Sequence, residues 1–460
     1  MTRIPWIVTA LVIGLLAPAL HAQEASESAS APETSESSAT SESAESPDTA
    51  EGLPFKEGDV ISYEDVGKLK PYLPKEFWNN RDFFFYEGMQ LEIGPTQADY
   101  SPSDVYKAAT EKHRGEARIG PDDSLENFTA GQPFPMDEID CLGDPDAGTK
   151  IMHNHSYQWR GAGTHTRFYY SYWDRGEELP LYYEGHAEGA VLSHRSEPTH
   201  SKNKGDVFRG EKRKSASGPT VEAPFDARGI VLLSYRYKSS DKPRADAKND
   251  DTWVYVPTLR RVRRISTAQR TDSISGTDFT FDDLFSFNGI VPQYTWECLG
   301  EQKILGPMNT KVLAYPYDKD HNFGPYGLSF ADDRWDLRDA VVVRFTPKNS
   351  DHPYHHKDIY LDKETLVSLY SFAYDRKNEL WKIIWHNKRW SQDHDLTGEW
   401  YRGWKDVPEP RDLIIVSDII ANVQTGTGNR IEFWDRDATD FPSKGKVRRF
   451  IDVGRLTKGR

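Results

Sequence analysis

DTWVYVPTLRRVRRISTAQRTDSISGTDFTFDDLFSFN, residues 251–288, is the stretch of this 460-residue chain that says most about its fold. It combines a short alternating strand pattern, a turn, a basic return strand and an aromatic segment with helix-capping residues. It contains no catalytic signature. The stretch therefore indicates a fold and a possible binding role, and it indicates no enzymatic reaction.

The first half of this stretch predicts a β-hairpin. Trp253 and Tyr255 share one face of a short strand over residues 253–256, and Pro257 with Thr258 turns the chain. The return strand carries four closely spaced arginines, Arg260, Arg261, Arg263 and Arg264. Such a run is typical of a solvated edge strand that is guarded by charge. It could also hold an anionic partner, because guanidinium groups bind phosphates and carboxylates well.

The second half predicts a short helix over residues 281–288. Thr280 and Asp283 form a capping-box pattern, and Gly289 is a suitable residue to follow the last turn. Phe281, Leu284 and Phe285 would then share one apolar face at helical spacing. A helix with such a face beside a curved sheet could gate a cavity, or it could be ordinary core.

A family resemblance enters at these residues. The series DTWVYVPTLRRVRRIS and GTDFTFDDL is similar to the W-x-Y-x-P … R-R-V-R-R-I … G-T-D-F-T-x-x-D-L stretch of LolA/LolB-like periplasmic proteins, which sort outer-membrane lipoproteins. Residues 127–135 (NFTAGQPFP) and 285–289 (FSFNG) resemble a longer, uncharacterised branch of that superfamily. Members of the branch tend to be encoded near RND/MMPL-type exporters and an outer-membrane partner. The resemblance is specific over residues 250–305 and looser over residues 55–460.

The resemblance implies a half-barrel of antiparallel strands with a hydrophobic cavity, and neither a cofactor nor an enzymatic activity. The cargo would be an acyl-bearing or otherwise lipophilic molecule; because the chain is much longer than the small lipoprotein carriers, we expect something other than a lipoprotein. We expect the cavity or its lid to include Trp253, Tyr255, Phe279, Phe281, Leu284 and Phe285. We expect an anion or a protein partner to contact Arg260, Arg261, Arg263 and Arg264.

Residues 1–22 predict a secretory signal peptide, with Arg3 before an apolar run over residues 5–20 and a cleavage site after Ala22. The run is short for a membrane span, which needs about twenty residues; an uncleaved anchor is the alternative. Residues 23–52 are mostly Ser, Glu, Ala and Thr, which predicts a disordered acidic tether. We therefore expect a soluble protein in the periplasm of a Gram-negative bacterium.

The chain has a net charge of −14, and without Arg3 and the eight acidic residues of the tether the rest carries −7. A mildly acidic protein of this kind does not favour nucleic acid as a partner. Charge alone identifies no other partner.

Residues 53–460 are expected to form a single, mainly β domain with a more helical part over about 53–150. Helices are expected after Ser62, towards Lys70, and from Ser101 and Pro102 to about His113, ending at Gly115. Strands are expected over residues 166–173, 230–237, 339–345, 413–424 and 430–434, with a meander over 358–390. This pattern predicts a large curved antiparallel sheet, a half-barrel, with a few short helices packed in or across its concave side.

Cys141 and Cys298 could form one long-range disulfide in an oxidising compartment, or remain two buried thiols. The sequence has no P-loop, H-E-x-x-H or G-x-S-x-G motif. Two histidine groups, at residues 153–155 and 352–356, have no Cys or carboxylate partner at ligand spacing. We therefore predict neither a metal site nor a cofactor.

Together these features favour a periplasmic, non-enzymatic carrier or adaptor that binds a lipid or another hydrophobic molecule. Two alternatives stay open. The abundant Trp and Tyr residues would also suit a glycan-binding or carbohydrate-active protein. The arginine hairpin would also suit a structural adaptor in an efflux or envelope-assembly complex.

Overall fold

The computed structural model describes residues 52–96, 98–174, 177–265, 270–311, 323–393, 403–437 and 444–458. The expected signal peptide (1–22) and all of the expected tether (23–52) except Gly52 lie outside these ranges. Within the described ranges, no helix has both the length and the apolar character that crossing a bilayer requires.

Fifteen strands form one sheet, in the order β1-β2-β12-β13-β14-β15-β16-β17-β5-β6-β7-β8-β9-β10, with β11 paired to β12. Its strands are β1 Val60–Ile61, β2 Leu91–Ile93, β5 Gly163–Asp174, β6 Glu177–Val191, β7 Arg213–Ala223, β8 Val231–Tyr237, β9 Asp251–Val256, β10 Arg261–Ile265, β11 Tyr294–Gly306, β12 Arg334–Pro347, β13 Tyr354–Asp362, β14 Ser368–Asp375, β15 Leu380–Trp390, β16 Leu413–Asn422 and β17 Thr427–Asp437. A separate pair joins β3 Arg118–Gly120 to β4 Ser124–Glu126. The expected mainly β fold with a large antiparallel sheet is confirmed.

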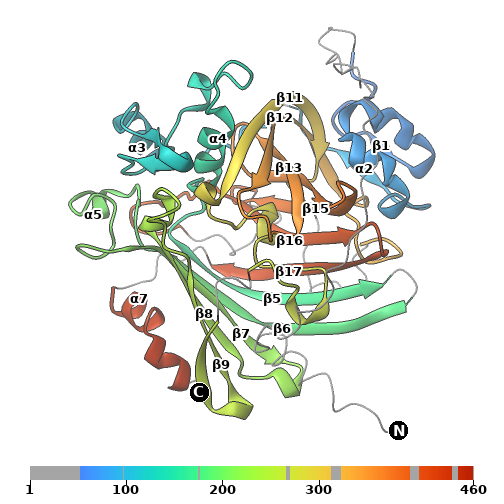
Figure 1. Cartoon of the computed structure of the whole chain (residues 1–460). Coiled ribbons are helices and arrows are strands. Elements are labelled where there is room, and N and C mark those ends of the chain that lie inside the picture. The colour runs from blue at the N-terminus through green and yellow to red at the C-terminus, as the bar shows by residue number, and fades with distance from the viewer. Residues whose placement is uncertain are drawn as a thin grey trace, which may run out of the picture.

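The sheet stays open and changes direction along its length. Strand direction turns steadily from β11–β13 through β16, β17 and β5 to β7–β9 (Figure 1), as the twist of neighbouring strands requires. The strand pairs are antiparallel, except that β2 runs parallel to β12. Because β17 pairs with β5, the late meander continues directly into the earlier strands, with Ile431 opposite Tyr170.

The helices are short, and the three longest, η1, α3 and α4, begin within the first third of the chain. The α-helices are α2 Lys75–Asn79, α3 Asp104–Lys112, α4 Ala147–Ser156, α5 Pro198–Ser201 and α7 Lys444–Phe450. The 3-10 helices are η1 Tyr63–Tyr72, η2 Arg81–Phe83, η3 Pro121–Asp123, η4 Met136–Glu138, η5 Phe225–Ala227, η6 Lys238–Asp241, η7 Pro257–Leu259, η9 Ile274–Gly276, η10 Leu284–Ser286, η11 Val291–Gln293 and η12 Val453–Lys458.

Both helices expected early in the chain form, with corrections. The one after Ser62 is a 3-10 helix, and the Ser62 hydroxyl donates to Glu64 at 2.6 Å. The second begins at Asp104 with Ser103, not Ser101, at the N-cap. Ser101 and Pro102 instead lie in the preceding loop, where the Ser101 carbonyl accepts a hydrogen bond from Arg411.

The central strands are buried on both faces. On one face an aromatic cluster joins the early helices to β12 and β15: Phe77 stacks on Phe84 with 4.5 Å between ring centroids, and both contact Trp385 edge-on. Such ring pairs add about 0.5–1.5 kcal/mol each beyond the area they bury. On the other face α4 packs on β11, where a β-carbon on Gly148 would lie only 2.8 Å from the Glu297 nitrogen.

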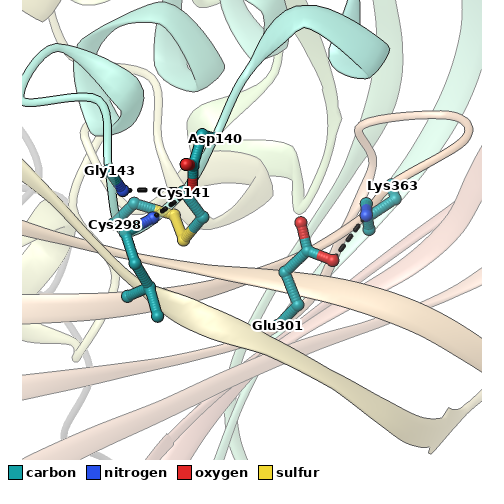
Figure 2. The surroundings of a disulfide bond; sticks show 7 residues. Asp140, Cys141, Gly143, Cys298, Glu301 and Lys363 are labelled. Atoms are coloured by element: carbon teal, nitrogen blue, oxygen red, sulfur yellow. Dashed lines mark hydrogen bonds and ion pairs between the residues drawn. A yellow bond between two sulfur atoms is a disulfide. The ribbon is translucent and has the colours of Figure 1, made fainter.

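A disulfide fastens the segment before α4 to the sheet. Cys141 is bonded to Cys298 of β11, across a sequence separation of 157 residues. Figure 2 shows this bond beside Asp140, whose carboxylate accepts the backbone N–H groups of Leu142 and Gly143 at 3.2 and 3.0 Å. The ion pair of Glu301 with Lys363, 2.5 Å long, joins β11 to the turn after β13 nearby.

The prediction of a helix over residues 281–288 is wrong. The segment contains only η10, and Phe285 and Ser286 have φ of 57° and 70°. The cause is tertiary: the Phe285 N–H donates to the Asp418 carboxylate of β16 at 3.1 Å, and the Asp283 carboxylate is taken by side chains of the sheet. The Thr280 hydroxyl does meet Asp283, at 3.0 Å, but the contact closes a loop instead of capping a helix.

Candidate functional site

The arginine hairpin forms as expected, at one end of the sheet. β9 and β10 pair antiparallel with Arg261 opposite Val256, and β10 pairs with no other described strand. Arg260 takes a left-handed backbone at φ 50° in the turn. Arg260, Arg261, Arg263 and Arg264 are exposed, and Arg264 forms an ion pair with Asp251.

The six residues expected at a cavity fall into two separate places. Trp253 and Tyr255 are partly buried against Tyr235 and the C-terminal α7 and η12, in one apolar cluster. Phe279 and Leu284 pack in a different cluster, against Phe168 and Tyr170 of β5. The two remaining rings, Phe281 and Phe285, are half-buried, Phe281 edge-on to Phe279 and Phe285 beside Phe433.

A pocket lies elsewhere, where α3, the end of α4 and two strand ends meet. The space between its walls, open solvent included, is about 360 Å³. It is lined by Tyr100, Pro102, Tyr106, Gln132, Gln158, Trp159, Glu364, Thr365, Leu366 and Val367 of the β13–β14 turn, and Arg411, Asp412 and Leu413. None of the six expected cavity residues lines it.

The pocket combines aromatic walls with one cation, Arg411, and two carboxyl groups, those of Glu364 and Asp412. Tyr106 and Trp159 lie 5.7 Å apart between ring centroids, and the Trp159 indole N–H donates to the Pro410 carbonyl at 2.6 Å. The Arg411 guanidinium donates through Nε to Ser101 and through Nη2 to Asp99, each at 3.0 Å. Its Nη1 makes no hydrogen bond with any described residue, so one donor remains for a guest. Hydrogen bonds from Ser101 lower the pKa of Asp99 to about 2, so that carboxylate is charged.

A buried ionic cluster, which the sequence analysis missed, holds the segment between β10 and β11 on the sheet. Asp283 meets Lys357 of β13 at 2.6 Å, Lys382 of β15 at 3.1 Å and the Tyr354 hydroxyl at 2.6 Å. All four side chains are buried. Burial alone would raise the pKa of Asp283, but the two lysine charges outweigh it and the pKa falls well below its usual value. A signal was present: Lys382, His386 and Lys388 are separated by even numbers of residues in one strand, so they share a face with the apolar Ile384.

A second buried chain of polar groups lies beside the first. Ser286 Oγ lies 2.9 Å from His386 Nε2, and His386 Nδ1 lies 3.1 Å from Asp418 Oδ1. The order of groups matches an acyl-transfer relay, but all three residues are fully buried, and none lines the pocket. Ser286 Oγ is also occupied by the Ser368 hydroxyl, which donates at 2.7 Å. In this arrangement the three groups anchor η10 to the sheet.

In the first histidine group, one ring nitrogen of each histidine lies against a backbone carbonyl. His153 Nε2 lies 2.8 Å from the Asp123 carbonyl, and His155 Nδ1 lies 2.8 Å from the Leu366 carbonyl. Burial lowers the pKa of His155 to about 3, so its imidazole is neutral. Among the residues that the structure describes, no three or more His, Cys, Asp or Glu side chains form a group that could hold a metal ion.

Comparison with known proteins gives one family match. Residues 61–429 match the model of a family described as protein of unknown function, DUF1329. No curated protein matches the chain.

Several solved structures are similar to the chain. A DUF1329 family protein from Desulfovibrio piger is 17% identical, with a TM-score of 0.45, over 68% of this chain and 99% of that one. An outer membrane lipoprotein-sorting protein domain from Vibrio parahaemolyticus is 16% identical, with a TM-score of 0.44, over 68% and 100%. A LolA superfamily protein from Nitrosomonas europaea is 11% identical, with a TM-score of 0.35, over 65% and 94%.

Proposed function

This chain belongs to the DUF1329 family, and from that premise we propose that it is a non-enzymatic periplasmic carrier that binds a lipophilic, anionic molecule. The observation that carries the proposal is the pocket beside α3. It offers aromatic walls for an apolar body and, for an acidic head group, the Arg411 Nη1 donor that no described residue occupies. The Glu364 carboxylate at the same pocket is paired with Arg338.

The energetics of such a site suit a carrier. An apolar group that leaves water gains about 25 cal/mol per Å² of buried surface, so binding needs no chemical step. Arg411 already stacks over Trp390, with 5.2 Å between the guanidinium and the ring centroid, and is held by Ser101. A cation fixed in this way loses little freedom when it receives a carboxylate or phosphate.

The absence of a familiar catalytic motif from the sequence and the burial of Ser286, His386 and Asp418 support a role without catalysis. The signal-peptide pattern of residues 1–22 supports the periplasmic location. The family resemblance of residues 250–305 supports lipid-like cargo, and it is also our reason to propose an RND/MMPL-type exporter and an outer-membrane protein as partners.

The test is a search for cargo in the purified full chain. Native mass spectrometry and organic extraction should find a co-purifying lipid or other lipophilic acid, and a fluorescent fatty acid should bind. Arg411→Ala should weaken that binding about tenfold or more, because a charge-assisted hydrogen bond is lost. Arg376→Ala is the matched control: Arg376 is exposed, donates to the Asp351 and His352 carbonyls, and lies outside the pocket. An empty protein that also fails to bind the probe would end the proposal.

A further inference from the structure

Two hairpin tips lie side by side at one end of the sheet. η5 (Phe225–Ala227) joins β7 to β8, and η7 (Pro257–Leu259) joins β9 to β10. Val231 pairs with Tyr255, so the two turns leave the sheet at the same level. They are in close contact, since a β-carbon on Gly229 would lie 3.1 Å from Pro257 Cγ.

The tips expose large apolar side chains. Phe225 is 85% exposed, the highest value among the large hydrophobic residues that the structure describes, and Leu259 on the neighbouring tip is 37% exposed. A single exposed Leu is ordinary. An almost fully exposed Phe on a projecting turn is unusual, because its ring forgoes the free energy that burial would provide. Its exposure suggests that something outside the chain covers it.

The same tips are strongly basic. Residues 224–230 and 257–263 carry one acid, Asp226, against four exposed arginines, Arg228, Arg260, Arg261 and Arg263. None of these four guanidinium groups forms an ion pair with a described residue. The concentration stands out in a chain whose net charge is −14.

The C-terminal helix extends this basic region. Val447 and Phe450 of α7 pack in the cluster that contains Trp253 and Tyr255 of β9, which places α7 beside β8 and β9 (Figure 1). The other long side chains of α7 are exposed and basic: Lys444, Lys446, Arg448 and Arg449. α7 therefore adds exposed cations beside the strands that carry the two tips.

We propose that this end docks on the surface of a bilayer rich in anionic phospholipid, with Phe225 inserted between head groups and the arginines on phosphates. Aromatic side chains gain free energy at the level of the head groups, and guanidinium groups bind phosphate in a forked geometry. The head-group layer of a bilayer can deform around two projecting turns, whereas a protein partner would need a concave surface of complementary shape. The proposal concerns delivery at a membrane and holds whatever the pocket beside α3 binds.

The test uses the full chain and two kinds of vesicle. Co-sedimentation should show binding to vesicles of equal phosphatidylglycerol and phosphatidylcholine, and little to phosphatidylcholine alone. Removing one basic residue near an anionic surface lowers the partition coefficient about fivefold. Arg261→Glu with Arg263→Glu should therefore lower it at least ~25-fold, and added salt should mimic the loss.

Two further variants separate charge from insertion. Lys107→Glu with Lys112→Glu changes net charge by the same amount on exposed positions of α3, and should retain most of the binding. Phe225→Ala should weaken binding several-fold at unchanged charge and with an unchanged circular dichroism spectrum. The proposal is overturned if the chain binds neither vesicle, if the α3 variant loses as much as the arginine variant, or if Phe225→Ala binds like the native chain. Capture of an acidic protein through the arginines without vesicle binding would also overturn it.

Discussion

Asp283 shows how much one residue can decide. Its carboxylate is the shared partner of Lys357 and Lys382, which come from strands more than seventy positions further along the chain. A buried ion pair contributes modestly compared with an apolar replacement, but removing one partner leaves the other charge stranded. In this cluster a single anion supports two cations, so its loss would strand both.

We expect Asp283→Asn to lower the free energy of unfolding by about 3–5 kcal/mol, because it leaves two buried ammonium groups without a counter-charge. Urea unfolding followed by tryptophan fluorescence measures this. Asp272→Asn, an exposed position in the same segment, is the control and should change the value by less than about 0.5 kcal/mol. Equal stabilities for the two variants would show that the cluster does not hold the segment.

Asp336 on β12 should make stability depend on pH. Burial raises the pKa of Asp336 to about 7, despite the hydrogen bond that the Tyr100 hydroxyl donates at 2.5 Å. Between about pH 4 and 7 the folded chain therefore holds a proton that the unfolded chain has released, so the free energy of unfolding falls as pH rises through this window.

Asp336→Asn lacks this proton and should gain stability relative to the native chain as pH rises from 4 to 7, by on the order of 2–4 kcal/mol. Parallel urea titrations at several pH values measure the difference. Asp339→Asn, an exposed position on the same strand, is the control for the loss of a carboxylate from β12. A difference between the Asp336 variant and the native chain that stays constant with pH would contradict the argument.

At the scale of elements, the hairpin β9–β10 and the segment that follows it differ in how well local sequence predicts their structure. The hairpin β9–β10 forms where alternation and turn residues place it, and the adjoining helix does not form. Helix caps contribute about 1 kcal/mol, which is less than the contacts that Asp283 and the Phe285 N–H find on the sheet. The segment thus becomes a strap that is tied to β13, β15 and β16.

The disulfide is the other long-range tie between elements. Replacing Cys141 and Cys298 together with Ser should lower the free energy of unfolding by about 2–5 kcal/mol, because the unfolded chain regains the freedom of a long loop. Urea unfolding of the double variant measures the loss, and the native chain under reducing conditions should match it. Identical midpoints for the oxidised native chain and the variant would refute the prediction.

At the scale of the whole molecule, the two proposed sites use different regions of one continuous sheet. The pocket lies near the ends of β13 and β16, close to α3, and the basic tips lie beyond β7–β10. Figure 1 shows α3 and the lower ends of β8 and β9 well separated. A bilayer that is bound by the tips would therefore lie away from α3.

The sequence by itself determined the fold class, the late meander, and the hairpin with its exposed arginine edge. These features depend on residues that are close together in the chain, such as the alternation in residues 253–256 and the turn at Pro257, so the local pattern is sufficient. The same is true of the short helix after Ser62.

Only the tertiary structure decided the path of residues 280–288, the pairing of the two cysteines, and the place of the pocket. Each depends on groups that lie far apart in sequence: Asp283 with Lys382, Cys141 with Cys298, Trp159 with Arg411. Sequence patterns report local conformational preferences that are worth about 1 kcal/mol each. A buried ion pair or a disulfide between distant residues changes the free energy of unfolding by several kcal/mol when it is broken. Where the two disagree, as at Phe285, the distant contact prevails.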